Sequence, residues 1–109
     1  MVEIQNKREY QMKNSEDMPI NQFQLNALLS KEEKEFYNYV IESNVFCTGC
    51  GKTCEQGITV NSLLLTSTND LVVQGICNVC QGKVARVMEF GENKEFYKKA
   101  MNFRNTVKI

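Results

Sequence analysis

The stretch CTGCGK at residues 47–52, together with CNVC at residues 77–80, decides the fold of this chain. Each motif holds two cysteines with two residues between them, and 26 residues separate the pairs. This spacing lets a tight turn direct both sulfurs of a pair at one ion. Gly51 follows Cys50 and frees the backbone there, whereas Gln81 intervenes before Gly82 in the second pair, which is a looser fit. The spacing predicts one tetrahedral site for Zn²⁺ or iron, ligated by Cys47, Cys50, Cys77 and Cys80.

Two other interpretations of the paired cysteines are weaker. Ordinary buried cysteines do not account for two pairs that each lie beside a glycine and strand-like sequence. A thioredoxin-like redox motif requires a longer βαβ context, which this sequence lacks. The metal site is therefore the favoured interpretation.

Cys54 is left over from this pairing. We interpret it as a small buried apolar residue at the edge of the metal site. Two functional alternatives stay open: replacement of Cys50 as a ligand under stress, and a nucleophile whose pKa is lowered by Lys52 or by the metal. The second is weak because the chain has no histidine to act as a base.

Outward from the cysteines, residues 45–91 carry the pattern of a small sheet. Segments 58–66 and 71–76 are rich in Val, Ile, Leu and Thr, and residues 67–70 between them have turn chemistry. A further strand is expected over 84–90. Both hairpin segments are apolar on both faces, so either helices or a second chain must cover one face, and a homo-oligomer stays open.

Helices are expected before this sheet. Residues 1–17 form a polar arm with few apolar side chains, and residues 18–44 form a helical segment. Pro19 is expected to open a first helix that runs to Leu29. Ser30 and Glu33 fit a capping box for a second helix, which ends near Ser43. Phe36, Tyr39 and Val40 are expected on one face of this helix.

Residues 92–109 are expected to form a C-terminal helix and tail. Asn93 can cap this helix, and Phe96, Ala100 and Phe103 lie on one stripe that should pack on the rest of the domain. The segment carries five basic and two acidic residues, whereas residues 1–44 carry five basic and eight acidic residues. The candidate partner-binding residues on this basic helix are Lys94, Lys98, Lys99 and Arg104.

Composition narrows the class of protein. The chain has 109 residues, with 13 basic and 13 acidic side chains, which suits one compact α+β domain with no net positive field. No apolar run approaches the roughly 18 residues of a membrane span, and the polar start is not a secretory signal. The chain has no histidine, which excludes Ser/His and Cys/His catalysis and Cys2His2 fingers.

Over residues 45–90 the chain resembles the zinc ribbon, a fold group that includes rubredoxin-like metal knuckles. The resemblance lies in the order of a strand, CTGCGK, two hairpin strands, CNVC and a further strand. It implies a small antiparallel zinc-ribbon sheet, here flanked by N-terminal helices and a C-terminal helix. Zinc ribbons serve as structural modules in transcription factors, ribosomal proteins, polymerase subunits and nucleic-acid enzymes, so the resemblance implies a binding role.

These observations predict a non-enzymatic, cytoplasmic binding protein with one structural zinc ion per chain and a protein partner. A site with four thiolate ligands has no open position for water, so it should not be catalytic. One alternative is a nucleic-acid-binding or transcription-associated zinc ribbon that uses the basic C-terminal helix. Another is a rubredoxin-like iron electron carrier, from which this chain departs because it has no tryptophan and no proline inside the second CxxC motif. No membrane partner is expected.

Overall fold

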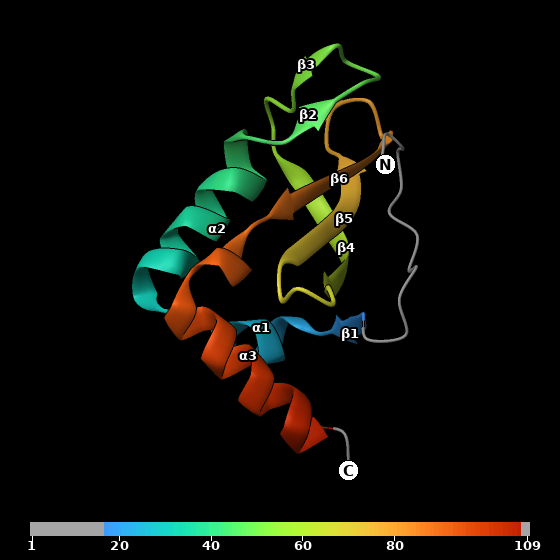
Figure 1. The fold of residues 1–109 in the computed structure, drawn as a ribbon. Helices are drawn as coiled ribbons and strands as arrows, with labels where there is room; N and C mark the ends of the chain where they lie inside the picture. Colours follow the sequence, from blue (N-terminus) through green and yellow to red (C-terminus); the bar gives the residue numbers. More distant parts are fainter. Residues whose placement is uncertain (1–16, 108–109) are drawn as a thin grey trace.

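The computed structural model describes residues 17–107 as an α+β fold (Figure 1). In chain order the elements are β1 (Met18–Ile20), α1 (Gln22–Leu28), α2 (Lys31–Ser43), β2 (Phe46–Cys47), β3 (Lys52–Thr53), β4 (Ile58–Leu65), β5 (Leu71–Cys77), β6 (Lys83–Met88), a 3-10 turn η1 (Phe90–Glu92) and α3 (Lys94–Val107). The prediction of an antiparallel sheet flanked by helices is confirmed. The polar arm predicted for residues 1–17 lies outside the described residues, apart from Asp17.

The main sheet is built around one long hairpin. Its strand order is β1-β4-β5-β6, all antiparallel, while β2 and β3 form a separate two-stranded sheet. In the hairpin, β4 and β5 run from the Ile58–Cys77 pair at one end to the Leu65–Leu71 pair at the other. The turn between them has the chemistry that the sequence predicted, with Asn69 in the left-handed region at φ 64°. The hairpin therefore carries the second cysteine pair at one end and this polar turn at the other.

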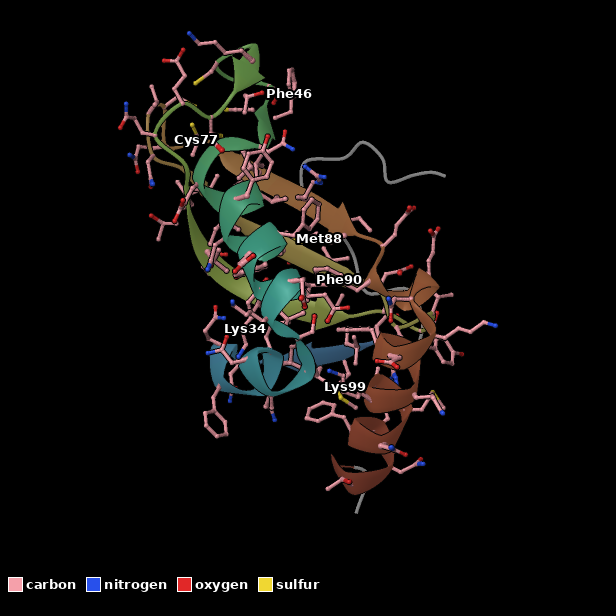
Figure 2. All side chains as sticks on the ribbon, turned by 90° about the vertical axis from the view of Figure 1, so that its left-hand side faces the viewer. Lys34, Phe46, Cys77, Met88, Phe90 and Lys99 are labelled. Carbon is pink, nitrogen blue, oxygen red and sulfur yellow. The ribbon has the colours of Figure 1, made fainter. Side chains whose placement is uncertain are left out.

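The helices cover one face of the hairpin, and α2 lies along the sheet (Figures 1 and 2). Alternation along the strands turns Leu63, Leu65, Leu71 and Val73 toward the helices. The most completely buried side chains of this core include Leu25, Val40, Val45, Leu65, Leu71, Met88 and Phe96. Residues of the cysteine-bearing strands and of the flanking helices therefore contribute to the same core.

The start of the helical region differs from the prediction. Pro19 does not open a helix; it lies in β1, opposite Leu64 of β4. Proline has no N–H to donate, so it suits an edge strand such as β1. The helix α1 begins instead after Asn21, which forms a capping box with Gln24.

The capping box predicted for α2 is confirmed. The Glu33 N–H donates to Ser30 Oγ over 3.2 Å, and the Ser30 N–H donates to Glu33 Oε1 over 2.8 Å. Of the three residues expected on one face, only Val40 is buried, and the other buried residue of α2 is Tyr37. Phe36 and Tyr39 are 44% and 55% exposed. The face is rotated because the Tyr37 hydroxyl reaches Gln22 Oε1 on α1 (3.3 Å).

The C-terminal helix packs as predicted. Asn93 caps it, since its Oδ1 accepts the Phe96 N–H over 3.0 Å. Phe96 and Ala100 are fully buried, and the half-buried Phe103 packs against the same core. The rings of Phe90 and Phe96 lie 5.3 Å apart between centroids, which fixes η1 and α3 together. The expected strand over 84–90 ends earlier, at Met88, because Phe90 already belongs to η1.

Candidate metal centre

Each cysteine pair sits on a turn that leaves a strand. Cys47 ends β2, and the chain returns so that the Gly51 N–H donates to the Cys47 carbonyl over 2.8 Å. Cys77 ends β5, and the Gln81 N–H donates to the Cys77 carbonyl over 2.9 Å. Gly51 and Gln81 therefore occupy equivalent places in the two turns.

These two residues also share a left-handed backbone. Gly51 has φ 74° and Gln81 has φ 68°. A residue with a Cβ pays about 1 kcal/mol in this region, whereas glycine does not. The looser fit that the sequence suggested for the second turn is thus a strained copy of the first turn, held in place by the surrounding contacts.

Asn78, the first residue after Cys77, ties the second turn to the end of the β3–β4 connection and to the start of β4. Its N–H donates to the Gly57 carbonyl (3.1 Å), its Nδ2 donates to the Gln56 carbonyl (3.0 Å), and its Oδ1 accepts from Thr59 Oγ1 (2.6 Å). These contacts hold the second cysteine pair at a fixed distance from the first. Sequence reasoning missed this role, because Asn78 only marks a turn until its distant partners are known.

The four paired cysteines come together at one point. Their Sγ atoms all lie within 4.8 Å of one another. Across the two turns, Cys47 Sγ lies 3.4 Å from Cys80 Sγ, and Cys50 Sγ lies 3.8 Å from Cys77 Sγ. Four sulfurs held about 2.3 Å from a tetrahedral zinc ion are separated by about 3.8 Å, so the donor set fits such an ion. The residues that could hold a metal are therefore the four that the spacing pointed to.

The ligands differ in exposure and in acidity. Cys47 and Cys77 are buried, Cys50 is half-buried and Cys80 is exposed. The Cys80 and Val79 N–H groups hold the pKa of Cys77 at about 6, and the Cys50 N–H lowers the pKa of Cys47. Burial and the neighbouring thiols raise the pKa of Cys50 to about 12. Without a cation the cluster thus keeps protons on some thiols, and a bound metal ion replaces those protons.

Cys54 lies beside this group but does not belong to it. Its side chain is 1% exposed and is part of the hydrophobic core. Burial raises its pKa to about 12, and the Lys52 ammonium pairs with Glu55 over 3.0 Å. The hypothesis of a nucleophile activated by Lys52 is therefore wrong, while burial in the core agrees with the apolar interpretation.

The candidate partner-binding residues separate into two groups. Lys94, Lys98 and Lys99 are exposed on α3. Arg104 is buried, and the prediction that it lies on the exposed basic face is wrong. Its Nε donates to Asn69 Oδ1 over 2.7 Å, and its Nη2 donates to the carbonyls of Leu65 (3.4 Å) and Thr66.

The placement of Arg104 follows from helix geometry. It stands four residues after Ala100 and eight after Phe96, so the three share the buried stripe of α3. The charge can be buried there because the β4–β5 turn offers it acceptors. This spacing was a signal in the sequence, and the apolar stripe should have been extended to include the arginine.

Comparisons with protein-family models, with curated proteins and with solved structures find no match to this chain. The resemblance to the zinc ribbon therefore rests on the cysteine spacing and on the sheet that carries it. Among residues 17–107, none of the helices combines the length and the apolar character that a membrane span requires.

Proposed function

We propose that this chain is a non-enzymatic protein-binding module whose fold is held by one zinc ion. The observation that carries the proposal is the gathering of Cys47, Cys50, Cys77 and Cys80 Sγ atoms within 4.8 Å. A bound zinc ion contributes folding free energy to small domains, of order 10 kcal/mol in zinc-finger peptides. With four thiolates as ligands the ion keeps no position for water or substrate, which supports a structural role over a catalytic one.

The preference for zinc over iron rests on the surroundings of the site. Zinc is redox-inactive and suits a closed tetrahedral set of four sulfurs. The chain lacks the tryptophan and the knuckle proline that the comparison with rubredoxins leads one to expect. A reducing compartment such as the cytoplasm keeps the cysteines available as thiolates, so we place the protein there.

A protein partner is supported by exposed apolar side chains near the cysteines. Phe46, directly before Cys47, is 60% exposed, and Val79, inside the second pair, is 52% exposed (Figure 2 labels Phe46). Tyr39 on α2 is 55% exposed. Aromatic residues are enriched at protein interfaces, where they supply most of the binding energy.

A nucleic-acid partner has less support. Four thiolates and one Zn²⁺ give the site a formal charge of about −2, which repels phosphate. The burial of Arg104 removes one cation from the basic face of α3 and leaves Lys94, Lys98 and Lys99. We therefore retain nucleic acid only as the alternative that an experiment must exclude.

Two measurements test this proposal. Native mass spectrometry and elemental analysis of the purified chain should find one zinc ion per chain and a colourless protein; a red, iron-containing protein, or a folded chain without metal, would contradict the zinc assignment.

Affinity capture with and without nuclease should retain the partner in both cases. Phe46→Ala should weaken capture more than the Lys94→Glu/Lys98→Glu double variant, and the reverse order, with loss after nuclease, would favour nucleic acid.

A further inference from the structure

The four cysteines of the metal centre are not equally accessible to reagents from solution. Cys47 and Cys77 are 1% and 0% exposed, and Cys50 is half-buried. Cys80 is the exposed member of the set. Among the four ligands, Cys80 is therefore the residue that a small oxidant reaches most easily.

Two residues that lie beside the Cys80 sulfur are glycines. A Cβ added at Gly49 would lie 3.0 Å from Cys80 Sγ, and one added at Gly82 would lie 3.3 Å from it. Both places are adjacent to the sulfur, and neither carries a side chain that could shield it. Gly49 and Gly82 come from the two different cysteine turns, so both turns leave a position beside this sulfur without a side chain.

A second ligand thiol, that of Cys47, lies close enough to Cys80 to form a disulfide with it. Cys47 Sγ lies 3.4 Å from Cys80 Sγ, closer than the 3.8 Å between Cys50 and Cys77. An oxidised sulfur that is this close to a second thiolate forms a disulfide. The disulfide removes two of the four donor atoms from the site, and a pair of thiolates does not retain the ion as four do.

We propose that Cys80 is the modification site at which hydroperoxides oxidise this cluster, and that disulfide formation with Cys47 releases the metal. The inference rests on the proposed metal site. With hydrogen peroxide, the Cys80 thiolate attacks one oxygen in the first step: an S–O bond forms, the O–O bond breaks, and the departing hydroxide takes a proton from solvent to become water. In the second step the Cys47 thiolate attacks the sulfenic sulfur: the S–S bond forms, the S–O bond breaks, and the departing hydroxide takes a proton to become a second water. The sulfur pair loses two electrons and the peroxide gains them.

The test uses the full zinc-loaded chain and hydrogen peroxide. Zinc release is followed with a chromogenic chelator, and the cysteines are mapped by peptide mass spectrometry after iodoacetamide blocks the remaining thiols. We expect release in step with a Cys47–Cys80 disulfide. A first disulfide between Cys50 and Cys77, or one that contains Cys54, would overturn the proposal, as would complete oxidation of Cys80 with the zinc retained.

Two variants test whether access to the Cys80 sulfur controls the rate of zinc release. Gly82→Ala places a methyl group against Cys80 Sγ, at a backbone position outside the left-handed region. It should slow zinc release several-fold while the zinc content stays at one per chain. Cys54→Ala is the matched control, since it removes a buried thiol that is not a ligand, and it should leave the rate and the disulfide unchanged. Loss of release in Cys54→Ala would show that Cys54, and not Cys47, resolves the oxidised sulfur.

This experiment also distinguishes the failure of this inference from the failure of the proposed function. If the chain never binds zinc, the proposed metal site is contradicted at the loading step, before peroxide is added. The disulfide mapping can still be done on that metal-free chain if it is folded, and it decides whether Cys80 reacts first. If the chain binds zinc but peroxide oxidises a cysteine other than Cys80 first, only this inference is contradicted.

Discussion

The two ends of the β4–β5 hairpin are held by different chemistry. At the cysteine end, Phe46 and Val79 are more than half exposed, and the sulfurs of both cysteine pairs meet within 4.8 Å. At the turn end, Asn69 is 0% exposed, and its side-chain oxygen accepts a hydrogen bond from the Arg104 guanidinium. Phe96, on the same helix as Arg104, is also fully buried. We therefore expect packing to suffice at the turn end, and the cysteine end to depend more on the proposed metal ion.

The turn end is also a junction of distant segments. Asp17 Oδ1 accepts the Ser67 N–H over 2.8 Å, and Asp70 Oδ1 accepts the Gly91 N–H over 2.9 Å. With Arg104, three segments that are far apart in the sequence converge on one turn. This end should therefore remain folded under conditions that disrupt the cysteine end.

The largest effect is expected from removal of a metal ligand. Cys47→Ser should abolish zinc binding and destabilise the fold by several kcal/mol, because ligation is coupled to folding. Amide hydrogen exchange should show the loss of protection beginning at β2, β3 and the Cys77 end of β5, with the β4–β5 turn protected longer. Equal loss of amide protection at both ends would show that the two ends unfold as one cooperative unit and would contradict the difference proposed between them.

Acidification should produce the next largest effect. In the metal-free fold, burial raises the pKa of Cys50 to about 12 and the pKa of Cys80 is also above its ordinary value, so both carry protons near neutrality. Zinc must displace these protons, so its affinity should fall by about tenfold per displaced proton for each unit of decreasing pH. As the pH falls through about 6, the pKa of Cys77, this thiol also binds a proton and the fall in affinity should steepen. A competition assay with a zinc-binding dye from pH 8 to pH 5 measures this slope, and a flat profile would contradict thiolate ligation.

At the helical end, the largest effect is expected from Phe96→Ala. Phe96 is fully buried against Phe90, so its truncation should cost about 3–5 kcal/mol. Phe103→Ala is the matched control, because Phe103 is only half-buried on the same stripe and should cost about half as much. Chemical denaturation of the zinc-loaded variants measures both, and an equal cost would show that α3 packs less deeply than the structure has it.

Replacing the buried Arg104 should lower the free energy of unfolding less than truncating Phe96 in the core. Arg104→Met keeps the bulk of the side chain but leaves Asn69 Oδ1 and two carbonyls without their donor, at a cost of about 2–4 kcal/mol. Arg104→Lys retains the charge without the fork of donors and should recover only part of the loss. The zinc content of both variants should stay at one per chain; a loss of zinc would show that the two ends of the hairpin are coupled.

What the sequence predicted well was local. The cysteine pairs, the Ser30 capping box and the Asn93 cap each depend on residues within four positions of one another, so their geometry follows from spacing. What it predicted poorly depends on distant partners. Pro19 lies in a strand because it pairs with Leu64, and Arg104 is buried because Asn69, 35 positions away, accepts its hydrogen bond. Helical periodicity alone did not separate Tyr37 from Tyr39, because contact with α1 decided which faced inward.

The smallest effect is expected from Cys54→Ala. Cys54 lies in the core, beside the ligands but outside the group that they form, so its replacement removes one buried sulfur and no donor. The cost should be about 1 kcal/mol, with the zinc content and the zinc affinity unchanged. Thermal denaturation and the dye competition assay measure the two quantities on the same sample. A large fall in zinc affinity would assign Cys54 to the metal site, and the cysteine end would then be held by five thiols instead of four.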